Sequence, residues 1–365
     1  MIVKEVSRHL EELAPLEFAE DFDNVGLLVG HPEQEVSGIL ITLDTLETVV
    51  DEAIDKKCNL IVSFHPILFT GLKKLTGATY VERAVLKAVK YGIAIYAIHT
   101  ALDNAWEGVN AQIANVLGLK DRQILIPKSG TLRKLTTYVP RADALALKEA
   151  LFEAGAGRIG NYSHCSFDVS GTGSFKARDG AQPAKGKVGE VHYEGEDQIH
   201  LVYSKDREKA ILTALMNTHP YEEVAYEIQT LQNTHPYVGM GMTGTLEKIW
   251  QEEAFLAYVQ ECMGTPVIRH SKLLGKKVSK IAVLGGSGAF AIEPAKRSGA
   301  DVLITSDLKY HHFFEAGDQL ILMDIGHFES EQFTKNLLLD HLTKKIPNFA
   351  ISLSESITNP IKYYF

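Results

Sequence analysis

The chain has 365 residues, more than one hydrophobic core usually supports, so we expect more than one domain. Hydrophobic residues make up 45% and charged residues 23%, a composition typical of globular proteins that fold in water. The net charge of −9 argues against a general nucleic-acid-binding or anionic-membrane surface, and no segment has the roughly 20 apolar residues of a membrane span. The three cysteines are far apart, which argues against a disulfide framework and favours a cytoplasmic protein.

Strand-like and helix-like segments alternate over the first part of the chain. The expected strands are residues 38–43, 60–64 and 93–98, and the expected helices are residues 45–57 and 80–91. In the first of these helices the apolar residues recur every three or four positions, which is typical of a helix that covers a sheet. This rhythm predicts an α/β domain, and residues 1–128 are expected to be its first half.

The middle of the chain, residues 129–234, predicts an inserted α+β domain. Strands and helices are expected there in the order β-α-β-β-α-β, with one additional short strand, which is the order of a ferredoxin-like module. Residues 171–189, rich in Gly, Lys and Ala, are expected to form an exposed loop.

The α/β rhythm returns over residues 235–365, so we expect the first and third parts to build one split α/β domain. The expected strands of the third part are residues 280–284, 301–305, 320–325 and 349–353, and its last helix is expected at residues 330–345.

Side chains that bind metal ions recur where these strands end. His65 follows one strand, His99 and Asp103 follow the next, and His327 and Glu331 follow the strand at 320–325. A helix that starts there would place His327 and Glu331 one turn apart on one face. Open α/β sheets bind ligands at the carboxyl ends of their strands. Each histidine alone is more simply a strand cap or a core hydrogen-bonding group, but the set His65, Asp103, His327 and Glu331 favours a metal site, with His99 as an additional candidate.

Imidazole and carboxylate donors without thiolates suit a divalent ion such as zinc, manganese, iron or magnesium. Glu331 could bridge two ions, as in two-metal hydrolytic centres, and is the expected catalytic residue. Asp44 and Asp307 also follow strands and could orient histidine ligands, although a helix N-cap is the favoured role for Asp44.

Two further motifs leave alternatives open. Residues 285–288, Gly-Gly-Ser-Gly, could cradle a phosphate through backbone N–H groups or form a tight strand-to-helix turn. Thr-His-Pro-Tyr occurs at 218–221 and 234–237, and two glutamates follow the first copy. His219 with Glu222 or Glu223 could line a pocket or a subunit contact, although a rigid Pro turn explains the motif more simply.

Several motifs together carry a resemblance to a known family. They are F-D-N-V-G-L-L-V-G (22–30), S-F-H-P-I-L-F (63–69), I-H-T-A-L-D (98–103), N-Y-S-H-C-S-F (161–167), H-P-Y-E-E (219–223), G-G-S-G (285–288) and G-H-F-E-S-E (326–331). With them the chain resembles the Ngg-interacting-factor-three-like family of dinuclear-metal-centre proteins, also described as GTP cyclohydrolase I type 2 homologs. The resemblance implies that His65, Asp103 and Glu331 bind one ion and that His327 and Glu331 bind the other. It also implies a toroidal homohexamer and a middle domain similar to PII and CutA-like trimeric modules.

The chain departs from the family pattern at one position. The family motif is usually His-His-Pro, and Phe64 stands where the first of these histidines would be. Phenylalanine cannot coordinate a metal, so the second ion is expected to bind weakly, to use His99 or water, or to be absent. We therefore expect one or two ions per chain, most simply zinc.

The resemblance and the donor set together predict a metal-dependent hydrolase that acts on a small nucleotide-like or phosphoester substrate. Under the cyclohydrolase description the target would be the imidazole ring of GTP. The alternative is a non-catalytic regulatory or assembly protein that binds metal and whose inserted domain senses a ligand.

Overall fold

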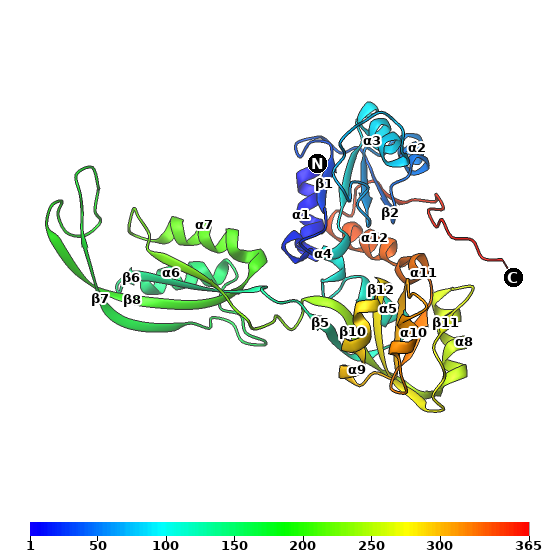
Figure 1. The fold of residues 1–365 in the computed structure, drawn as a ribbon. Coiled ribbons are helices and arrows are strands. Elements are labelled where there is room, and N and C mark those ends of the chain that lie inside the picture. Colours follow the sequence, from blue (N-terminus) through cyan, green and yellow to red (C-terminus); the bar gives the residue numbers. More distant parts are fainter. Residues whose placement is uncertain (365) are drawn as a thin grey trace. The chain divides into compact units, whose positions relative to one another are not determined.

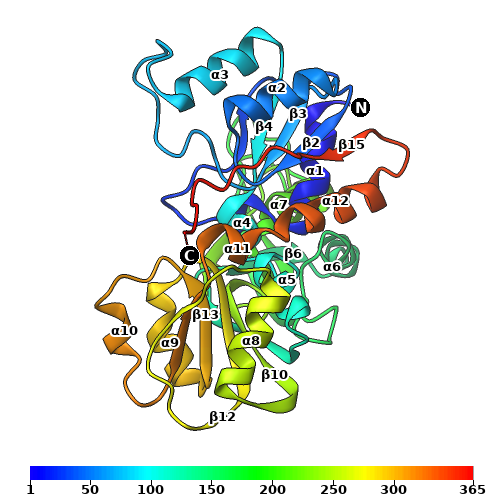
Figure 2. The ribbon, with the colours of Figure 1, turned by 90° about the vertical axis from the view of Figure 1, so that its right-hand side faces the viewer.

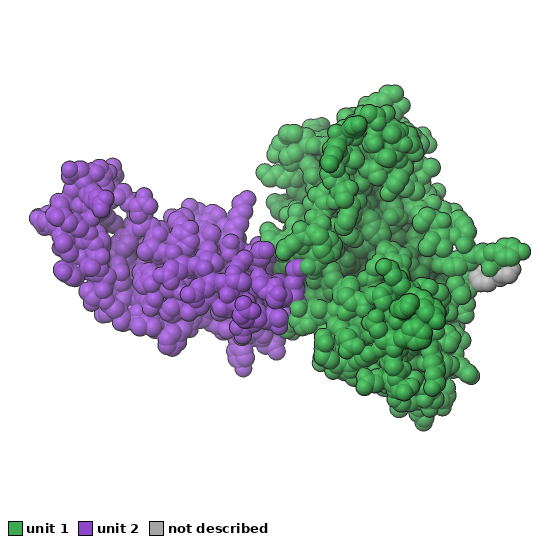
Figure 3. All heavy atoms as spheres, viewed as in Figure 1, with its two compact units in different colours: residues 1–127, 236–365 green, residues 128–235 purple. Residues whose placement is uncertain are grey.

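The structure is a computed structural model that describes residues 1–364, and these residues fall into two compact units (Figure 3). The first unit combines residues 1–127 with the residues from 236 onward, and the second unit contains residues 128–235. Both units contain helices and sheets, which confirms a mixed α/β protein. No helix in the described part of the chain is long and apolar enough to cross a membrane.

One sheet of the first unit has the strand order β1-β4-β3-β2-β15, and Figure 2 labels its strands β2, β3, β4 and β15. Its strands are β1 (Gly26–Val29), β2 (Ile39–Thr42), β3 (Leu60–Ser63), β4 (Ala94–Ala97) and β15 (Ile351–Leu353). All pairs are parallel except β1 with β4. Every residue of β2, β3 and β4 is buried, as is typical of parallel strands covered on both faces. Strands β1 to β4 come from residues 1–127 and β15 comes from the stretch after residue 235, so both stretches of the first unit build this sheet.

The other sheet of the first unit has the order β11-β14-β13-β12-β10-β5. Its strands are β5 (Lys120–Pro127), β10 (Gly239–Gln251), β11 (Arg269–His270), β12 (Lys277–Ser287), β13 (Val302–Ser306) and β14 (Ile321–Asp324). The central strands β12, β13 and β14 are parallel, and the outer pairs are antiparallel. Here β5 is the strand that the first stretch of chain contributes.

Helices cover both sheets of the first unit (Figures 1 and 2). They are α1 (Val3–Leu13), α2 (Glu47–Asp55), α3 (Tyr80–Lys90), α4 (His99–Asp103), α5 (Val109–Val116), α8 (Glu252–Met263), α9 (Ile292–Ser298), α10 (His312–Glu315), α11 (His327–Glu331) and α12 (Thr334–Lys345), with short 3-10 turns at Leu16–Phe18 and Ala289–Ala291. Leu40 and Ile61 pack with α2 and α3 on one face of the first sheet. Ile39 and Ile41 face a large central core that includes α1, α12 and the second sheet. The helix expected at 330–345 is thus two helices, α11 and α12.

The second unit contains one sheet with the order β7-β8-β6-β9 and only antiparallel pairs. Its elements are β6 (Leu132–Pro140), α6 (Ala144–Glu153), β7 (Phe167–Lys176), β8 (Val191–Ser204), a 3-10 turn at Lys205–Arg207, α7 (Glu208–Thr218) and β9 (Tyr226–Thr230). This is the expected β-α-β-β-α-β order. Its core is formed by apolar residues of β6, β8, α6 and α7.

Two expectations within the second unit are wrong. The additional short strand does not form a separate element, because residues 191–204 are one continuous strand, β8, and the expected loop at 171–189 begins only after Lys176. Residues 171–176 pair with residues 191–196 of β8, so a long hairpin forms although the glycines at 171 and 173 disfavour a strand.

The chain end is tied to α2 by the side chain of Glu52. Its carboxylate accepts hydrogen bonds from the backbone N–H groups of Glu355 and Ser356 and from the hydroxyls of Ser354 and Ser356, and it pairs with Lys56 at 2.8 Å. Burial would raise the pKa of Glu52, but these donors hold it at about 2. Glu52 therefore fixes the segment that leads into residues 359–361.

We expect Glu52→Gln to destabilise the first unit by about 2 kcal/mol, because several hydrogen bonds to a charged acceptor become weaker. Asp55→Asn is the matched control, since Asp55 is exposed on the same helix. Because the pKa of Glu52 is lowered by folding, its contribution is complete above about pH 4.5 and is lost as the pH falls through about 2. Urea unfolding at several pH values should show the Gln variant converging on the wild type over that interval, and a difference independent of pH would contradict this account.

Candidate metal centre

His65 lies just beyond β3, where its backbone continues the parallel register. Its N–H donates to the carbonyl of Leu43 at 2.8 Å, and the Ser63 hydroxyl donates to its carbonyl at 2.7 Å. His65 is thereby fixed beside the end of β2, where Asp44 Oδ1 lies 2.9 Å from its Nδ1. The N-cap role favoured for Asp44 is wrong, because α2 follows Leu46 with no side-chain cap and the Asp44 carboxylate binds His65 instead.

The second sheet repeats this arrangement. Asp307 follows β13 and His327 follows its parallel neighbour β14, and Asp307 Oδ2 lies 2.7 Å from His327 Nδ1. The Ser287 hydroxyl donates to the same carboxylate. In both pairs a carboxylate binds Nδ1 of the imidazole. Nε2, on the other side of the ring, therefore points away from that carboxylate and can bind a cation.

The two Nε2 atoms meet at the carboxylate of Glu331. As expected, Glu331 lies one turn after His327, on α11. Its Oε2 is 3.1 Å from Nε2 of His65 and 3.2 Å from Nε2 of His327. Two donor atoms that share an ion at about 2.1 Å lie about 3–3.4 Å apart, so the observed separations are compatible with a shared metal ion as well as with an imidazole–carboxylate ion pair. His65, His327 and Glu331 form the one three-residue cluster with this spacing among the described residues.

The electrostatics of the cluster are strongly coupled. Burial would raise the pKa of Glu331, but the neighbouring His65 and His327 hold it at about 2. Burial would lower the pKa values of both imidazoles, but the carboxylates on either side raise them to about 10 for His65 and about 9 for His327. The buried Glu331 carboxylate is thus matched to positive charge.

Asp103, at the end of α4, lies outside this three-residue cluster but contributes to the charge of the site. Its Oδ1 is buried and has no hydrogen-bond partner in residues 1–364. Burial and the nearby charge of Glu331 raise the pKa of Asp103 well above its ordinary value. A buried carboxylate oxygen without a donor is costly unless a cation lies beside it, so these residues fit a divalent ion.

His99 is also near the cluster without being part of it. Its ring centre is 5.3 Å from that of His65, and its Nδ1 lies 2.8 Å from Asp23 Oδ1. Thr100 donates to Asp23 as well. Asp23 was not predicted as a site residue, because 76 positions separate it from His99 and its position in the F-D-N-V-G motif was the only signal.

An open pocket of about 340 Å³ gives access to this region. It is lined by Leu43, Asp44, His65, His99, His327, Phe328, Asn359, Pro360 and Ile361. The Asn359 amide donates to Glu329 Oε1 at 3.1 Å, which attaches the segment 359–361 to α11. Residues 359–361 therefore form one wall beside the candidate ligands.

Phe64 is completely buried behind the histidines. Its ring centre lies 4.8 Å from that of His65 and 5.6 Å from that of His99. The phenylalanine at the position expected to carry a histidine therefore packs against both His65 and His99.

The glycine-rich turn at 285–288 packs against the cluster. The N–H groups of Gly285, Gly286 and Gly288 donate to Asn110 Oδ1, Ser330 Oγ and the Ser306 carbonyl. Of the two roles left open for this motif, these internal hydrogen bonds favour the tight strand-to-helix turn, because the three N–H groups already have partners inside the protein. The turn instead makes room for Glu331, since a Cβ atom on Gly286 would lie 2.5 Å from Glu331 Oε1.

We expect Gly286→Ala to displace Glu331 and weaken metal binding. Gly299→Ala is the matched control, because Gly299 has the same φ of +72° but no atom within 4 Å of an added Cβ. Left-handed strain should cost each variant about 1–2 kcal/mol, and overpacking should cost Gly286→Ala about 1–3 kcal/mol more. Urea unfolding and zinc titration of both variants test this, and equal losses in the two would contradict it.

Known proteins match this chain over its whole length. Residues 1–360 match the family described as Duf34/NIF3 (NGG1p interacting factor 3). A Bacillus subtilis protein named GTP cyclohydrolase 1 type 2 homolog is 36% identical, covering 99% of this chain and 98% of its own length, and a Halalkalibacterium halodurans protein of the same name is 38% identical, with 87% and 86% covered. The crystal structure of a Bacillus cereus protein related to NIF3 superposes with a TM-score of 0.84 at 34% identity, with 100% and 99% covered. The chain therefore belongs to the Duf34/NIF3 family.

Proposed function

We propose that this protein binds a divalent metal ion through His65, His327, Glu331 and Asp103 and uses it in hydrolysis. One observation carries the proposal: two imidazole Nε2 atoms, one from each sheet, lie 3.1 and 3.2 Å from one oxygen of a buried carboxylate, and the buried Asp103 Oδ1 beside them has no hydrogen bond within the described chain. Two orienting carboxylates, Asp44 and Asp307, support it.

The donor set supports zinc first, with manganese, iron or magnesium as alternatives. Asp44 and Asp307 keep the Nδ1 positions protonated, so that both Nε2 atoms can act as ligands when the imidazoles are neutral. His99, held by Asp23, is the additional donor on the same pocket. With Phe64 in place of an imidazole, we propose one firmly bound ion per chain and a weak or absent second one.

A divalent ion at this position would polarise the substrate and lower the pKa of water. The protein's own residues would then orient the reactants: Glu331 lies between the two sheets and contacts both imidazoles, and Asp103 adds a second buried carboxylate beside it. The adjoining pocket has a volume suited to a small molecule. The substrate class proposed is a nucleotide-like or phosphoester compound, in keeping with the printed name of the relatives, GTP cyclohydrolase 1 type 2 homolog.

The remaining expectations belong to the same proposal. We propose that the two compact units are domains, with a PII- or CutA-like insert, and that the protein works in the cytoplasm as a homohexamer. A regulatory or assembly role without catalysis is the rival, since Glu331 would equally join the two halves of the first unit through an ion.

Metal content and turnover separate the proposal from its rival. We expect His65→Ala, His327→Ala and Glu331→Gln to lower zinc affinity at least 10-fold by removing a ligand, whereas His311→Ala, at an exposed histidine outside the cluster, leaves it unchanged. Metal analysis and zinc titration of protein purified without chelator measure this. Wild-type stoichiometry in Glu331→Gln would contradict the site.

The same protein, loaded with zinc or manganese, would be incubated with GTP, other nucleotides and phosphodiesters. Turnover that Asp103→Ala abolishes supports the hydrolase. No turnover, together with a lower melting temperature or a dissociated oligomer in Asp103→Ala, rejects the hydrolase and favours the rival.

A second prediction concerns the departure at Phe64. We expect Phe64→His to raise the metal content from about one to about two ions per chain, because it adds an imidazole beside His65 and His99. Phe64→Leu is the control, since it remains apolar and cannot coordinate. An unchanged ratio in Phe64→His, in a variant that unfolds at the same temperature as Phe64→Leu, would show that this position does not limit the second ion.

A further inference from the structure

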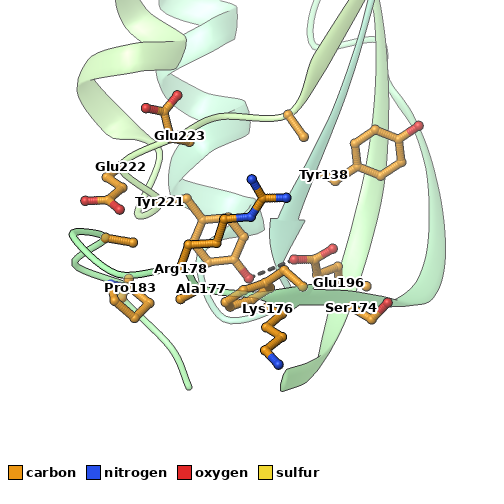
Figure 4. Close-up of a pocket in the computed structure, with 15 residues that line it drawn as sticks. Tyr138, Ser174, Lys176, Ala177, Arg178, Pro183, Glu196, Tyr221, Glu222 and Glu223 are labelled. Atoms are coloured by element: carbon orange, nitrogen blue, oxygen red, sulfur yellow. Dashed lines mark hydrogen bonds between the residues drawn. The ribbon is translucent and has the colours of Figure 1, made fainter. Parts of the chain in front are cut away.

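A second pocket, of about 420 Å³, lies within the second unit and is independent of the metal site (Figure 4). Its walls come from β6, the end of β7, the loop that follows β7, β8 and the turn after α7. Its volume is in the range of pockets that bind small molecules. Most of its lining surface is apolar, and a few charged side chains are placed around it.

One corner of this pocket is held rigidly by the first Thr-His-Pro-Tyr motif. His219 is buried, its Nε2–H donates to the Tyr138 carbonyl at 2.9 Å, and its Nδ1 accepts from the N–H of Tyr221 at 3.1 Å. The Tyr221 hydroxyl donates to Glu196 Oε1 at 2.7 Å. Of the roles left open for this motif, His219 fixes the turn, while Tyr221 and the two following glutamates line the pocket.

The opposite wall is a loop that is anchored to this corner. The N–H of Gln182 donates to Glu222 Oε1 at 2.9 Å, and the N–H of Gly189 donates to the Ala177 carbonyl at 2.9 Å. The loop is therefore joined to the corner by one hydrogen bond and closed on itself by another. A pre-formed site binds more tightly, because less conformational freedom is lost on binding.

Two aromatic rings provide a surface for a flat apolar group. Phe175 and Tyr221 pack edge to face, with ring centres 5.8 Å apart, and Pro183 lines the same space. Aromatic rings prefer such edge-to-face or offset contacts with another ring.

Charged groups of both signs are available to a ligand. Arg178 forms no ion pair or hydrogen bond through its guanidinium with any residue from 1 to 364, and Figure 4 shows it facing the same space as Tyr221 and Glu196. Glu196 uses Oε1 for Tyr221 and has Oε2 beside Gly173, where a Cβ atom would lie only 2.0 Å away. Gly173 thus provides the room that Glu196 occupies, and Oε2 remains able to accept a hydrogen bond.

We propose that this pocket binds a free α-amino acid with an aromatic side chain. The carboxylate of the ligand pairs with Arg178, its ammonium group with Glu196, and its ring packs against Phe175 and Tyr221. A polyphosphate fits less well, because three glutamates and only two cationic side chains line the pocket. The amino acid is therefore recognised by one cationic and one anionic side chain of the same pocket and by an aromatic surface.

Calorimetric titration of the full chain with L-phenylalanine, L-tryptophan and L-leucine tests this. We expect saturable binding of one aromatic amino acid per chain. Phenethylamine, which lacks the carboxylate, and 3-phenylpropionate, which lacks the ammonium group, should bind at least 10-fold more weakly. Arg178→Gln should weaken binding of L-phenylalanine about 10- to 100-fold, as expected for loss of a charge-assisted pair. Arg158→Gln, at an exposed arginine of the same unit outside the pocket, should have no effect.

Three results would overturn the proposal. The first is the absence of saturable binding of any of these amino acids at concentrations up to about 10 mM, where the binding free energy is only about −3 kcal/mol. The second is equal affinity for L-phenylalanine in Arg178→Gln and Arg158→Gln. The third is that ATP binds more tightly than the amino acids and depends on Arg178 in the same way. Unchanged melting temperatures of both variants establish that any loss of binding is local. Because no metal-site residue is altered, failure here leaves the proposed hydrolase untouched.

Discussion

The buried carboxylate of Glu331 is the group on which the arrangement of the first unit depends. A lone buried carboxylate is costly, and this one is matched by imidazoles that approach from both sheets. Gly286 has no side chain where the Glu331 carboxylate lies, so the glycine-rich turn leaves room for this carboxylate. Residues from both stretches of the first unit therefore contact the charged carboxylate of Glu331. A cation bound between them would stabilise the first unit.

Each of the two stretches of the first unit contributes a strand to the sheet of the other, and this holds the two sheets together around Glu331. β15 completes the first sheet and β5 completes the second, so neither sheet is made by one stretch alone. In each sheet an aspartate after one parallel strand binds the histidine after the next, Asp44 with His65 and Asp307 with His327. The same local device, used twice, directs two imidazoles toward a common point.

The sequence predicted the parts of this site that depend on local order. Alternation of apolar runs located the parallel strands, and the spacing of His327 and Glu331 placed them on one helix face. It could not predict the role of Asp23, since its contact with His99 arises only when β1 joins β4. The N-cap assigned to Asp44 failed for a similar reason, because a side chain from the neighbouring strand competed for its carboxylate. Pairing with β8 likewise extends β7 through the glycines at 171 and 173, although glycines in the sequence predict a loop.

The most direct test of the central claim is a crystal structure of the protein grown with zinc, with anomalous scattering recorded on both sides of the zinc absorption edge. We predict one strong anomalous peak within about 2.0–2.2 Å of Nε2 of His65, Nε2 of His327 and a carboxylate oxygen of Glu331. No peak at this position, in crystals that contain stoichiometric zinc elsewhere on the chain, would contradict the account.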